Sequence, residues 1–192
     1  MNNKNKKNLS FNNIIIFPTD TVYGMGVKLY DRKGLQTIYQ LKKRSLEKEI
    51  IVLCASLQEA QILVQLNEIS YQLAASFWPG PLTLILKTQT AYFEATGKKT
   101  IGIRVPKHPL ALSLLKKHGP LKTTSVNESG GPPLNDYNII YKMYCQKVLF
   151  IYPNNFPISK VSSTIVDATT NKLIILRQGN IKKETIQKVI KE

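Results

Sequence analysis

Seven short apolar runs recur along the chain, and each has the length of a buried β-strand. They are rich in Ile, Val and Leu, and polar segments separate them. The runs lie at 14–17, 50–54, 82–87, 100–105, 147–152, 163–168 and 172–177. A further short strand is expected to end in the hydroxyl-rich stretch "TTS" at 123–125.

The segments between these runs carry helix signals. Asp31 can cap a helix that continues to about Arg44, and Ser56 with Glu59 predicts a capping box. Further helices are expected at 69–77, where "WPGP" must end the helix, at 109–119 and at 181–190. Strands that alternate with helices predict an α/β fold, and the strand-rich second half suggests some antiparallel pairing.

Length and composition fit one folded domain. A chain of 192 residues can bury a substantial core, and 43% of its residues are apolar. Residues 1–13 are polar and basic and lack the apolar core of a signal peptide, so we expect a flexible leader followed by a single domain at 14–192. No apolar window is long enough for a membrane helix, and Cys54 and Cys145 lack metal or redox spacing, as in a cytoplasmic protein with free thiols.

The chain is strongly basic, with 27 Lys and Arg against 12 Asp and Glu and a net charge of +15. Such a charge favours anionic partners such as nucleotides, RNA or pyrophosphate. The lysines are dispersed along the chain, however, so a general bias toward lysine explains the charge equally well.

Several familiar sites are excluded by their missing residues. There is no G-x-x-x-x-G-K-[ST] loop, and Gly24 and Gly26 lack the third glycine of a dinucleotide fingerprint. His108 and His118 flank one predicted helix without a nearby acid or cysteine pattern, so we expect surface residues. A nucleotide site in this chain would need another design.

Four polar clusters instead stand at the ends of predicted elements. They are "FPTDTVYGMG" (17–26), "LKKRSLEKE" (41–49), "KTTSVNESGGPP" (122–133) and "VSSTIVD" (161–167). Each type of cluster also occurs as an ordinary turn or a solvated helix end. The basic cluster at 41–49 can serve as a phosphate clamp, because arginine offers a planar fork and lysine a point charge.

One arginine interrupts an apolar strand. In "TIGIRVP" the alternation puts Ile101, Ile103 and Val105 on one face and Gly102 and Arg104 on the other. A buried arginine is costly unless an anion or an acid meets it, and a substrate carboxylate would serve.

Seven blocks, in their order and spacing, resemble the YrdC family, the L-threonylcarbamoyladenylate synthases. They are "FPTDTVYGMG", "LKKRSLEKEI", "FWPGPLTLILK", "IGIRVPKHPLA", "TTSVNESGGPP", "SSTIVDA" and "LRQG", from about residue 14 to residue 180. The resemblance implies a twisted, open mixed sheet flanked by helices, with a large basic cavity. It also implies a nucleotidyltransferase that condenses L-threonine, bicarbonate or CO2, and ATP into threonylcarbamoyl-AMP and pyrophosphate. Other proteins then transfer the threonylcarbamoyl group to adenosine 37 of tRNA.

The resemblance further implies two sets of site residues. The ATP-binding set is Lys42, Arg44, Leu46, Ser125, Asn127, Pro133 and Arg177, and the threonine-binding set is Thr19, Thr21, Arg104, Thr123 and Ser163. No catalytic side chain and no dedicated metal ligands are expected, because positioning and charge neutralisation supply most of such a transfer. Mg²⁺ would arrive bound to ATP.

Some residues depart from the family pattern, and other functions stay open. Ser45 replaces a common proline, and Ser162 stands where a glutamate is usual. Longer members carry an extra C-terminal domain, so we expect the short, single-domain type. The alternatives are an RNA-binding module, with weak RNA binding as a secondary property, and a carbamoyl-transfer domain like that of hydrogenase-maturation proteins. Against the first, the chain lacks the aromatic strands of an RRM and the GXXG of a KH domain.

Overall fold

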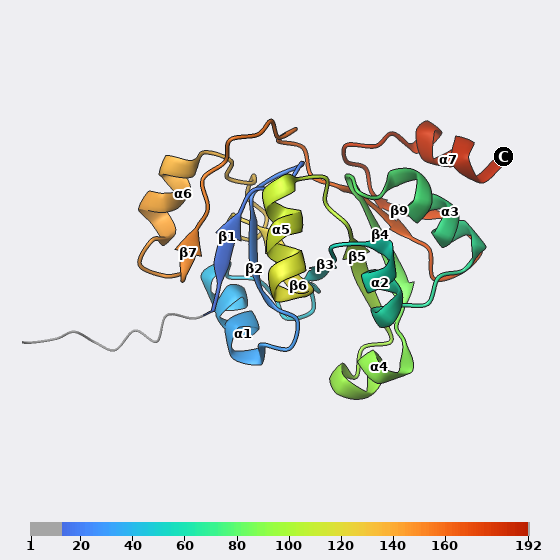
Figure 1. Ribbon diagram of the computed structural model, residues 1–192, viewed down its shortest axis with the longest axis horizontal. Coiled ribbons are helices and arrows are strands. Elements are labelled where there is room, and N and C mark those ends of the chain that lie inside the picture. The colour runs from blue at the N-terminus through green and yellow to red at the C-terminus, as the bar shows by residue number, and fades with distance from the viewer. Residues whose placement is uncertain (1–12, 192) are drawn as a thin grey trace, which may run out of the picture.

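The structure, a computed structural model, describes residues 13–191 and contains one mixed β-sheet (Figure 1). Among these residues nine strands pair in the order β7-β1-β2-β6-β3-β5-β4-β8-β9. The pairs β1–β7, β3–β5 and β4–β8 are parallel, and the other neighbours are antiparallel. The strands are β1 Ile15–Phe17, β2 Gly24–Lys28, β3 Ile51–Leu53, β4 Leu82–Lys87, β5 Thr100–Arg104, β6 Leu121–Ser125, β7 Phe150–Ile151, β8 Thr164–Asp167 and β9 Ile174–Arg177.

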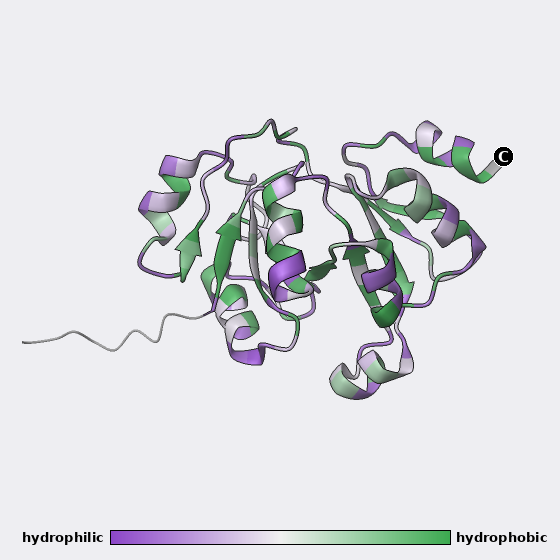
Figure 2. Ribbon diagram, in the orientation of Figure 1, coloured by the Kyte–Doolittle hydropathy of each residue, from purple (hydrophilic) through white to green (hydrophobic). Residues whose placement is uncertain are grey.

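Seven helices in the described range flank this sheet, which confirms the expected fold class. Their bounds are α1 Arg32–Leu41, α2 Leu57–Leu63, α3 Glu68–Phe77, α4 Thr90–Thr96, α5 Pro109–His118, α6 Tyr137–Tyr144 and α7 Lys183–Lys191. Figure 2 shows that hydrophobic residues dominate the strands and that hydrophilic residues lie on the outer sides of the helices and in the loops. No helix of the described residues is long and apolar enough to cross a membrane.

Two opposite faces of the sheet are packed differently. On one face α1 and α6 cover β1 and β2, and α2, α3 and α7 cover β3, β4 and β5, in two clusters of buried apolar residues. On the other face α5 packs against Phe17, Leu53 and Leu121. Residues alternate along each strand, so this second face also carries Gly102 and Arg104. It is the face on which the polar site described below lies.

Most predicted elements are confirmed, with shifted ends. Asp31 caps α1 by accepting from the Gly34 N–H, but the helix ends at Leu41 instead of near Arg44. The reason is local, because Lys43 takes a left-handed backbone conformation with φ of 49°. Pro109 opens α5, and Gly119 follows its last residue as expected.

The predicted capping box takes another form. The Ser56 side chain does accept from the Glu59 N–H, but the Glu59 carboxylate accepts from the N–H of Ala55, one residue before the cap. The reciprocal pair forms at the start of α3 instead, between Asn67 and Ser70.

His108 was expected on the surface, and this prediction is wrong. Its side chain is buried, because the residue caps α5 and its Nδ1 accepts from the Ala111 N–H. The Nε2 atom lies 3.2 Å from Oδ1 of Asn154. That oxygen already accepts from the Phe156 N–H, so the Nε2 atom of His108 is the donor and its Nδ1 the acceptor. His118 is partly exposed.

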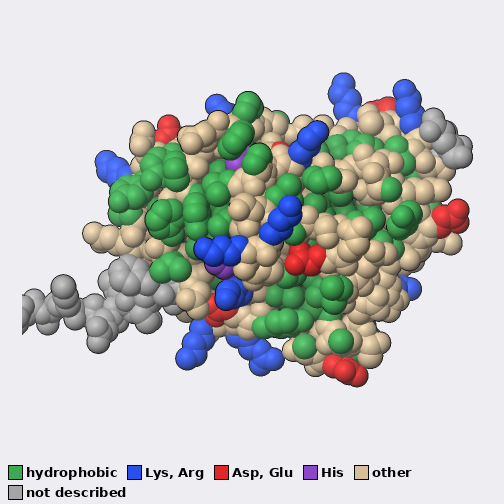
Figure 3. Space-filling view, in the orientation of Figure 1, with side chains coloured by type: hydrophobic (Ala, Val, Ile, Leu, Met, Phe, Trp, Pro, Cys, Tyr) green, Lys and Arg blue, Asp and Glu red, His purple; other side chains and the backbone are tan. Residues whose placement is uncertain are grey.

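Two expectations concern the ends and the surface of the molecule. The predicted leader at 1–13 lies outside the described residues except for Asn13, which is exposed, and the single domain at 14–192 stays a prediction. On the face drawn in Figure 3, Lys and Arg side chains are scattered, with a small group near the centre, and apolar side chains occupy much of the area between them. The basic charge of this face is therefore spread out.

Candidate functional site

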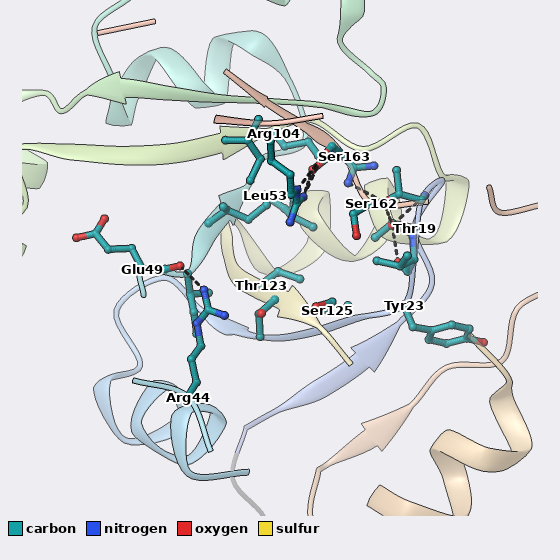
Figure 4. A pocket seen from close by; sticks show the side chains of 18 residues that line it. Thr19, Tyr23, Arg44, Glu49, Leu53, Arg104, Thr123, Ser125, Ser162 and Ser163 are labelled. Atoms are coloured by element: carbon teal, nitrogen blue, oxygen red, sulfur yellow. Dashed lines mark hydrogen bonds between the residues drawn. The ribbon is translucent and has the colours of Figure 1, made fainter. Parts of the chain in front are cut away.

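A cavity of about 160 Å³ brings together residues from distant parts of the chain (Figure 4). Its walls include all five predicted threonine-binding residues and three of the seven predicted ATP-binding residues. These are Thr19, Thr21, Arg104, Thr123 and Ser163 in the first set, and Arg44, Ser125 and Arg177 in the second. Figure 4 shows Thr19, Arg104 and Ser163 toward one side, and Arg44 and Glu49 toward another.

The turn between β1 and β2 forms one wall, and Thr19 organises it. The Thr19 hydroxyl donates to the carbonyl of Val22 at 2.6 Å, and the N–H groups of Thr21 and Val22 donate to the same hydroxyl oxygen. Backbone bonds from Ser159 and Lys160 hold the turn from outside. These bonds satisfy the buried backbone of a segment that has no ladder partner, as buried polar groups require.

Arg104 lies beside this turn, and an acid of the chain itself meets it. Its Nη2 lies 2.6 Å from Oδ1 of Asp20, its Nη1 donates to the Thr21 hydroxyl at 2.7 Å, and its Nε donates to the Gly80 carbonyl at 2.9 Å. Burial lowers the pKa of the Arg104 guanidinium, and the Asp20 carboxylate opposes this shift. Asp20 therefore keeps a buried arginine charged before any substrate binds.

Ser163 and Arg177 continue the wall on the side of β8 and β9. The Ser163 hydroxyl lies 2.9 Å from the Thr83 hydroxyl, and the Arg177 guanidinium donates to the Ser163 carbonyl at 2.8 Å from Nη2. Partial burial lowers the pKa of Arg177. Its charge also lowers the pKa of Arg104, though less than burial does.

Arg44 reaches the cavity from the loop after α1. Its Nε donates to the Lys48 carbonyl at 2.8 Å, and its Nη2 donates to the Glu49 carbonyl at 3.0 Å. Both acceptors are neutral and belong to the same loop, so the guanidinium is held in place with its charge uncompensated. The Glu49 carboxylate, which also lines the cavity, pairs with Lys98 at 2.9 Å.

Lys42 is one of four predicted ATP-binding residues outside the cavity walls. Its side chain is buried, and its Nζ donates to the Ser125 carbonyl at 2.6 Å and to the Asn127 carbonyl and side-chain oxygen at 2.8 Å each. Burial and the neighbouring Arg44 lower the pKa of Lys42 to about 8. These bonds use all three N–H donors of the Lys42 ammonium group, so Lys42 holds the segment from Ser125 to Asn127 in position.

The remaining predicted ATP-binding residues are Asn127, Pro133 and Leu46. Asn127 accepts from the Ser125 hydroxyl at 2.7 Å, Pro133 follows in the same loop, and Leu46 is 72% exposed. None of the three lines the cavity, which holds Ser125 itself. Of these three, Asn127 is tied directly to the cavity wall through its hydrogen bond with Ser125.

The walls contain hydroxyl, backbone and guanidinium groups, and no histidine or cysteine of residues 13–191 is among them. Within the same range, no three His, Cys, Asp or Glu residues are close enough to hold a metal ion. Cys54 is buried, and burial raises the pKa of its thiol. The guanidinium and hydroxyl groups of this arrangement are suited to holding anions in fixed positions.

Asp20 is the site residue that the sequence did not reveal. It stands in the opening turn, but the residue it pairs with is 84 positions away. The one available signal was the need of Arg104 for an acid or anion within an apolar strand.

Comparison with known proteins finds relatives of similar sequence and fold. A *Pyrococcus abyssi* protein named threonylcarbamoyl-AMP synthase is 33% identical over 183 residues, which cover 93% of this chain and 54% of the relative. A *Methanocaldococcus jannaschii* protein named putative threonylcarbamoyl-AMP synthase is 30% identical and is covered over 84% of its length. The crystal structure of *P. abyssi* Sua5 complexed with L-threonine matches with a TM-score of 0.86 and 31% identity over 93% of this chain and 54% of that one.

The chain thus spans about half the length of the first of these relatives. The model of the family described as Telomere recombination, which groups Sua5, YciO and YrdC, matches residues 7–179. A match over this much of the sequence, together with the relatives above, means that the chain belongs to the Sua5/YciO/YrdC family.

Proposed function

We propose that this chain makes threonylcarbamoyl-AMP from L-threonine, bicarbonate or CO2, and ATP, and releases pyrophosphate. The observation that carries the proposal is one cavity in which an acid-paired arginine, Arg104, and an arginine held by neutral carbonyls, Arg44, lie among hydroxyl groups. Relatives of this family named for the same product support it. Transfer of an AMP group makes the proposed enzyme a nucleotidyltransferase.

L-threonine would bind beside the turn at Thr19. Three of the five N–H donors of Arg104 are used within the protein, and the remaining two are available to a substrate carboxylate. The Thr21 hydroxyl accepts from this guanidinium, and Ser163 lines the same cavity. The *P. abyssi* relative solved with L-threonine supports this assignment of the amino acid.

ATP would lie with its phosphates toward Arg44 and Ser125. Arg44 is fixed by its own loop, and Ser125 is fixed through Lys42 and Asn127, so both residues are in place before the nucleotide arrives. In this proposal Lys42 and Asn127 act on ATP through the position of Ser125. Fixed donors cost little reorganisation when charge develops on transferred phosphate.

The proposed chemistry needs positioning more than acid–base catalysis. The threonine amine adds to CO2 and loses one proton to give a carbamate. A carbamate oxygen then bonds to the α-phosphorus of ATP while the bond from that phosphorus to the pyrophosphate oxygen breaks. The chain holds the two reactants together and neutralises the phosphate charge, which are the main contributions to phosphoryl transfer.

Mg²⁺ is proposed to enter with ATP. The cavity offers one carboxylate, Glu49, and neutral oxygens such as the Ser125 hydroxyl, which fits an ion that keeps most of its ligands from phosphate and water. When bound, the ion would neutralise triphosphate charge and favour departure of pyrophosphate.

Pyrophosphate release from ATP tests the function directly. We expect release by the purified chain to require both L-threonine and bicarbonate, to be much slower with L-serine, and to fall sharply in Arg44→Ala. Release that is independent of threonine would refute the proposal. Absence of release together with salt-sensitive tRNA binding would favour the RNA-binding alternative. Proteins that transfer the threonylcarbamoyl group to tRNA are the proposed downstream partners.

A further inference from the structure

Asp20 lies behind the cavity wall and holds the buried guanidinium of Arg104. Its Oδ1 accepts from Nη2 of Arg104 at 2.6 Å and from the N–H of Lys107 at 3.0 Å. The side chains of Arg104 and Asp20 are 5% and 15% exposed. The carboxylate therefore acts on Arg104 from the protein side, while the guanidinium faces the cavity.

The charge partners of the three cavity arginines differ. Arg104 has a carboxylate within contact distance, whereas Arg44 and Arg177 donate to carbonyl and hydroxyl oxygens. In the described part of the chain, neither Arg44 nor Arg177 forms a salt bridge. Only the charge of Arg104 is thus offset by an acid in direct contact.

Arg104 and Arg177 line the same cavity, and the charge of Arg177 contributes to lowering the pKa of Arg104. With Asp20 present, two guanidinium charges and one carboxylate charge leave one net positive unit at this end of the cavity. One positive unit matches a single carboxylate. Without Asp20 the same cavity wall would hold two guanidinium groups with no acid in contact, and a pair of arginines of this kind suits phosphate binding.

We propose that Asp20 determines which anion binds at Arg104. By offsetting one of the two guanidinium charges that line this part of the cavity, it makes this end of the cavity accept a monocarboxylate and reject the more highly charged phosphates of ATP and pyrophosphate. The inference rests on the proposed function, in which a carboxylate and a polyphosphate must occupy one small cavity without exchanging places. Asp20 is a positioning residue, since it acts on the substrate through Arg104.

Pyrophosphate is the probe that tests this proposal. In the wild type we expect pyrophosphate to compete with ATP and not with L-threonine. In Asp20→Asn, whose amide oxygen can still accept from Arg104 and Lys107, we expect pyrophosphate binding to tighten about tenfold and to become competitive with L-threonine. A gain of binding cannot come from simple loss of structure.

Two further variants identify the origin of the gain. Glu94→Gln removes the same charge from an exposed residue of α4 and should leave the pyrophosphate affinity unchanged. The double variant Asp20→Asn/Arg104→Gln should lose the tightening, because the guanidinium that Asp20 masks is then absent.

Unchanged pyrophosphate affinity in a folded Asp20→Asn variant would overturn the proposal. If that variant fails to fold, the wild type provides the test. The proposal would then be overturned if saturating pyrophosphate weakened the binding of L-threonine tenfold or more. Calorimetric titration with pyrophosphate needs no turnover, so its result is separate from that of threonine-dependent release. The effect of Asp20 on pyrophosphate binding can thus be refuted while threonine-dependent pyrophosphate release is still observed. The opposite pair of results can be recognised equally well.

Discussion

Replacing Lys42 with methionine is the sharpest test of how the loop beside the cavity is built. Methionine keeps much of the buried aliphatic stem and removes the ammonium group. The change takes the charged donor from the Ser125 carbonyl and from both oxygens of Asn127, which lie 2.6 to 2.8 Å from Nζ.

The size of the effect follows from these three bonds. A hydrogen bond to a charged group contributes about 1.5–3 kcal/mol, but a part-buried loop can relax and admit water, so the three losses do not add. We expect the free energy of unfolding to fall by about 2–4 kcal/mol, which for a chain of this size lowers Tm by roughly 5–15 °C. Because Ser125 loses its support, we also expect kcat/KM for ATP to fall about 30- to 100-fold.

The neighbouring lysine supplies a matched control. Lys43 forms an ion pair with Glu128 at 3.0 Å, but the two side chains are 74% and 61% exposed. Lys43→Met should therefore cost well under ~1 kcal/mol. Urea unfolding and ATP-dependent kinetics of both variants, with L-threonine binding measured by calorimetry, separate loop support from general destabilisation.

The structural role of Lys42 is refuted if Lys42→Met behaves like Lys43→Met in both assays. It also fails if threonine and ATP binding weaken equally in Lys42→Met, because a support for Ser125 should act on the nucleotide side. A stable Lys42→Met variant with lost ATP binding and unaltered Ser125 would instead make Lys42 a direct phosphate ligand.

Three more predictions concern the arginines, a helix cap and the sheet. Arg44→Ala should mainly raise KM for ATP, and Arg104→Ala should mainly raise KM for L-threonine. Each increase should be roughly 30- to 150-fold, because each variant loses a charged contact that contributes ~2–3 kcal/mol. Normal steady-state kinetics in both variants would contradict the site. Burial lowers the pKa of His108 below its ordinary value near 6.5, against the smaller opposing effects of Asn154 and Asp20, so the unfolded chain binds the proton more readily. The stability contributed by the neutral His108 ring is then fully present above about pH 6.5, and it declines as the pH falls toward the lowered pKa. Urea unfolding between pH 7 and 5 should show this decline in the wild type. The decline should be smaller in His108→Asn, because asparagine is a good helix cap that does not titrate. Gly102→Ala should destabilise by about 1–3 kcal/mol in the same assay, because its Cβ would lie 2.8 Å from Cγ2 of Ile51, and an unchanged unfolding midpoint would refute this packing.

The strands that contain apolar runs were predicted, and so was β6, whereas β2 was missed. β4 was predicted with both of its ends because four of the six residues of "LTLILK" are Leu or Ile. β2 was missed because "GMGVK" begins with glycines, which indicate a turn. In the structure the glycine at position 26 is required by packing within the sheet, since a side chain there would collide with Thr123 of β6. α6 was also missed, even though Asp136 caps it and Ile140 and Tyr144 form its buried face.

In the site, too, residues within short stretches of sequence could be predicted, whereas contacts between distant parts of the chain could not. The turn at Thr19 and the arginine of β5 could be recognised in short stretches of sequence, and the structure brings both to one cavity. The buried position of Lys42 and the pairing of Asp20 with Arg104 depend on contacts 83 to 85 residues apart. No periodic pattern encodes such contacts, because they form only when the sheet closes.

The parallel pairing of β4 with β8 has a consequence for synthesis of the chain. Leu82 pairs with Thr164, whereas β4 can pair with β5 as soon as residues 100–104 have left the ribosome. At about 5–20 residues per second, one edge of β4 waits several seconds for its partner, and exposed edges of this kind invite intermolecular association. The cavity shares this delay, because Ser163 and Arg177 complete its wall. A nascent chain should therefore gain ligand protection late and in one step, and chaperone demand should peak before β8 emerges.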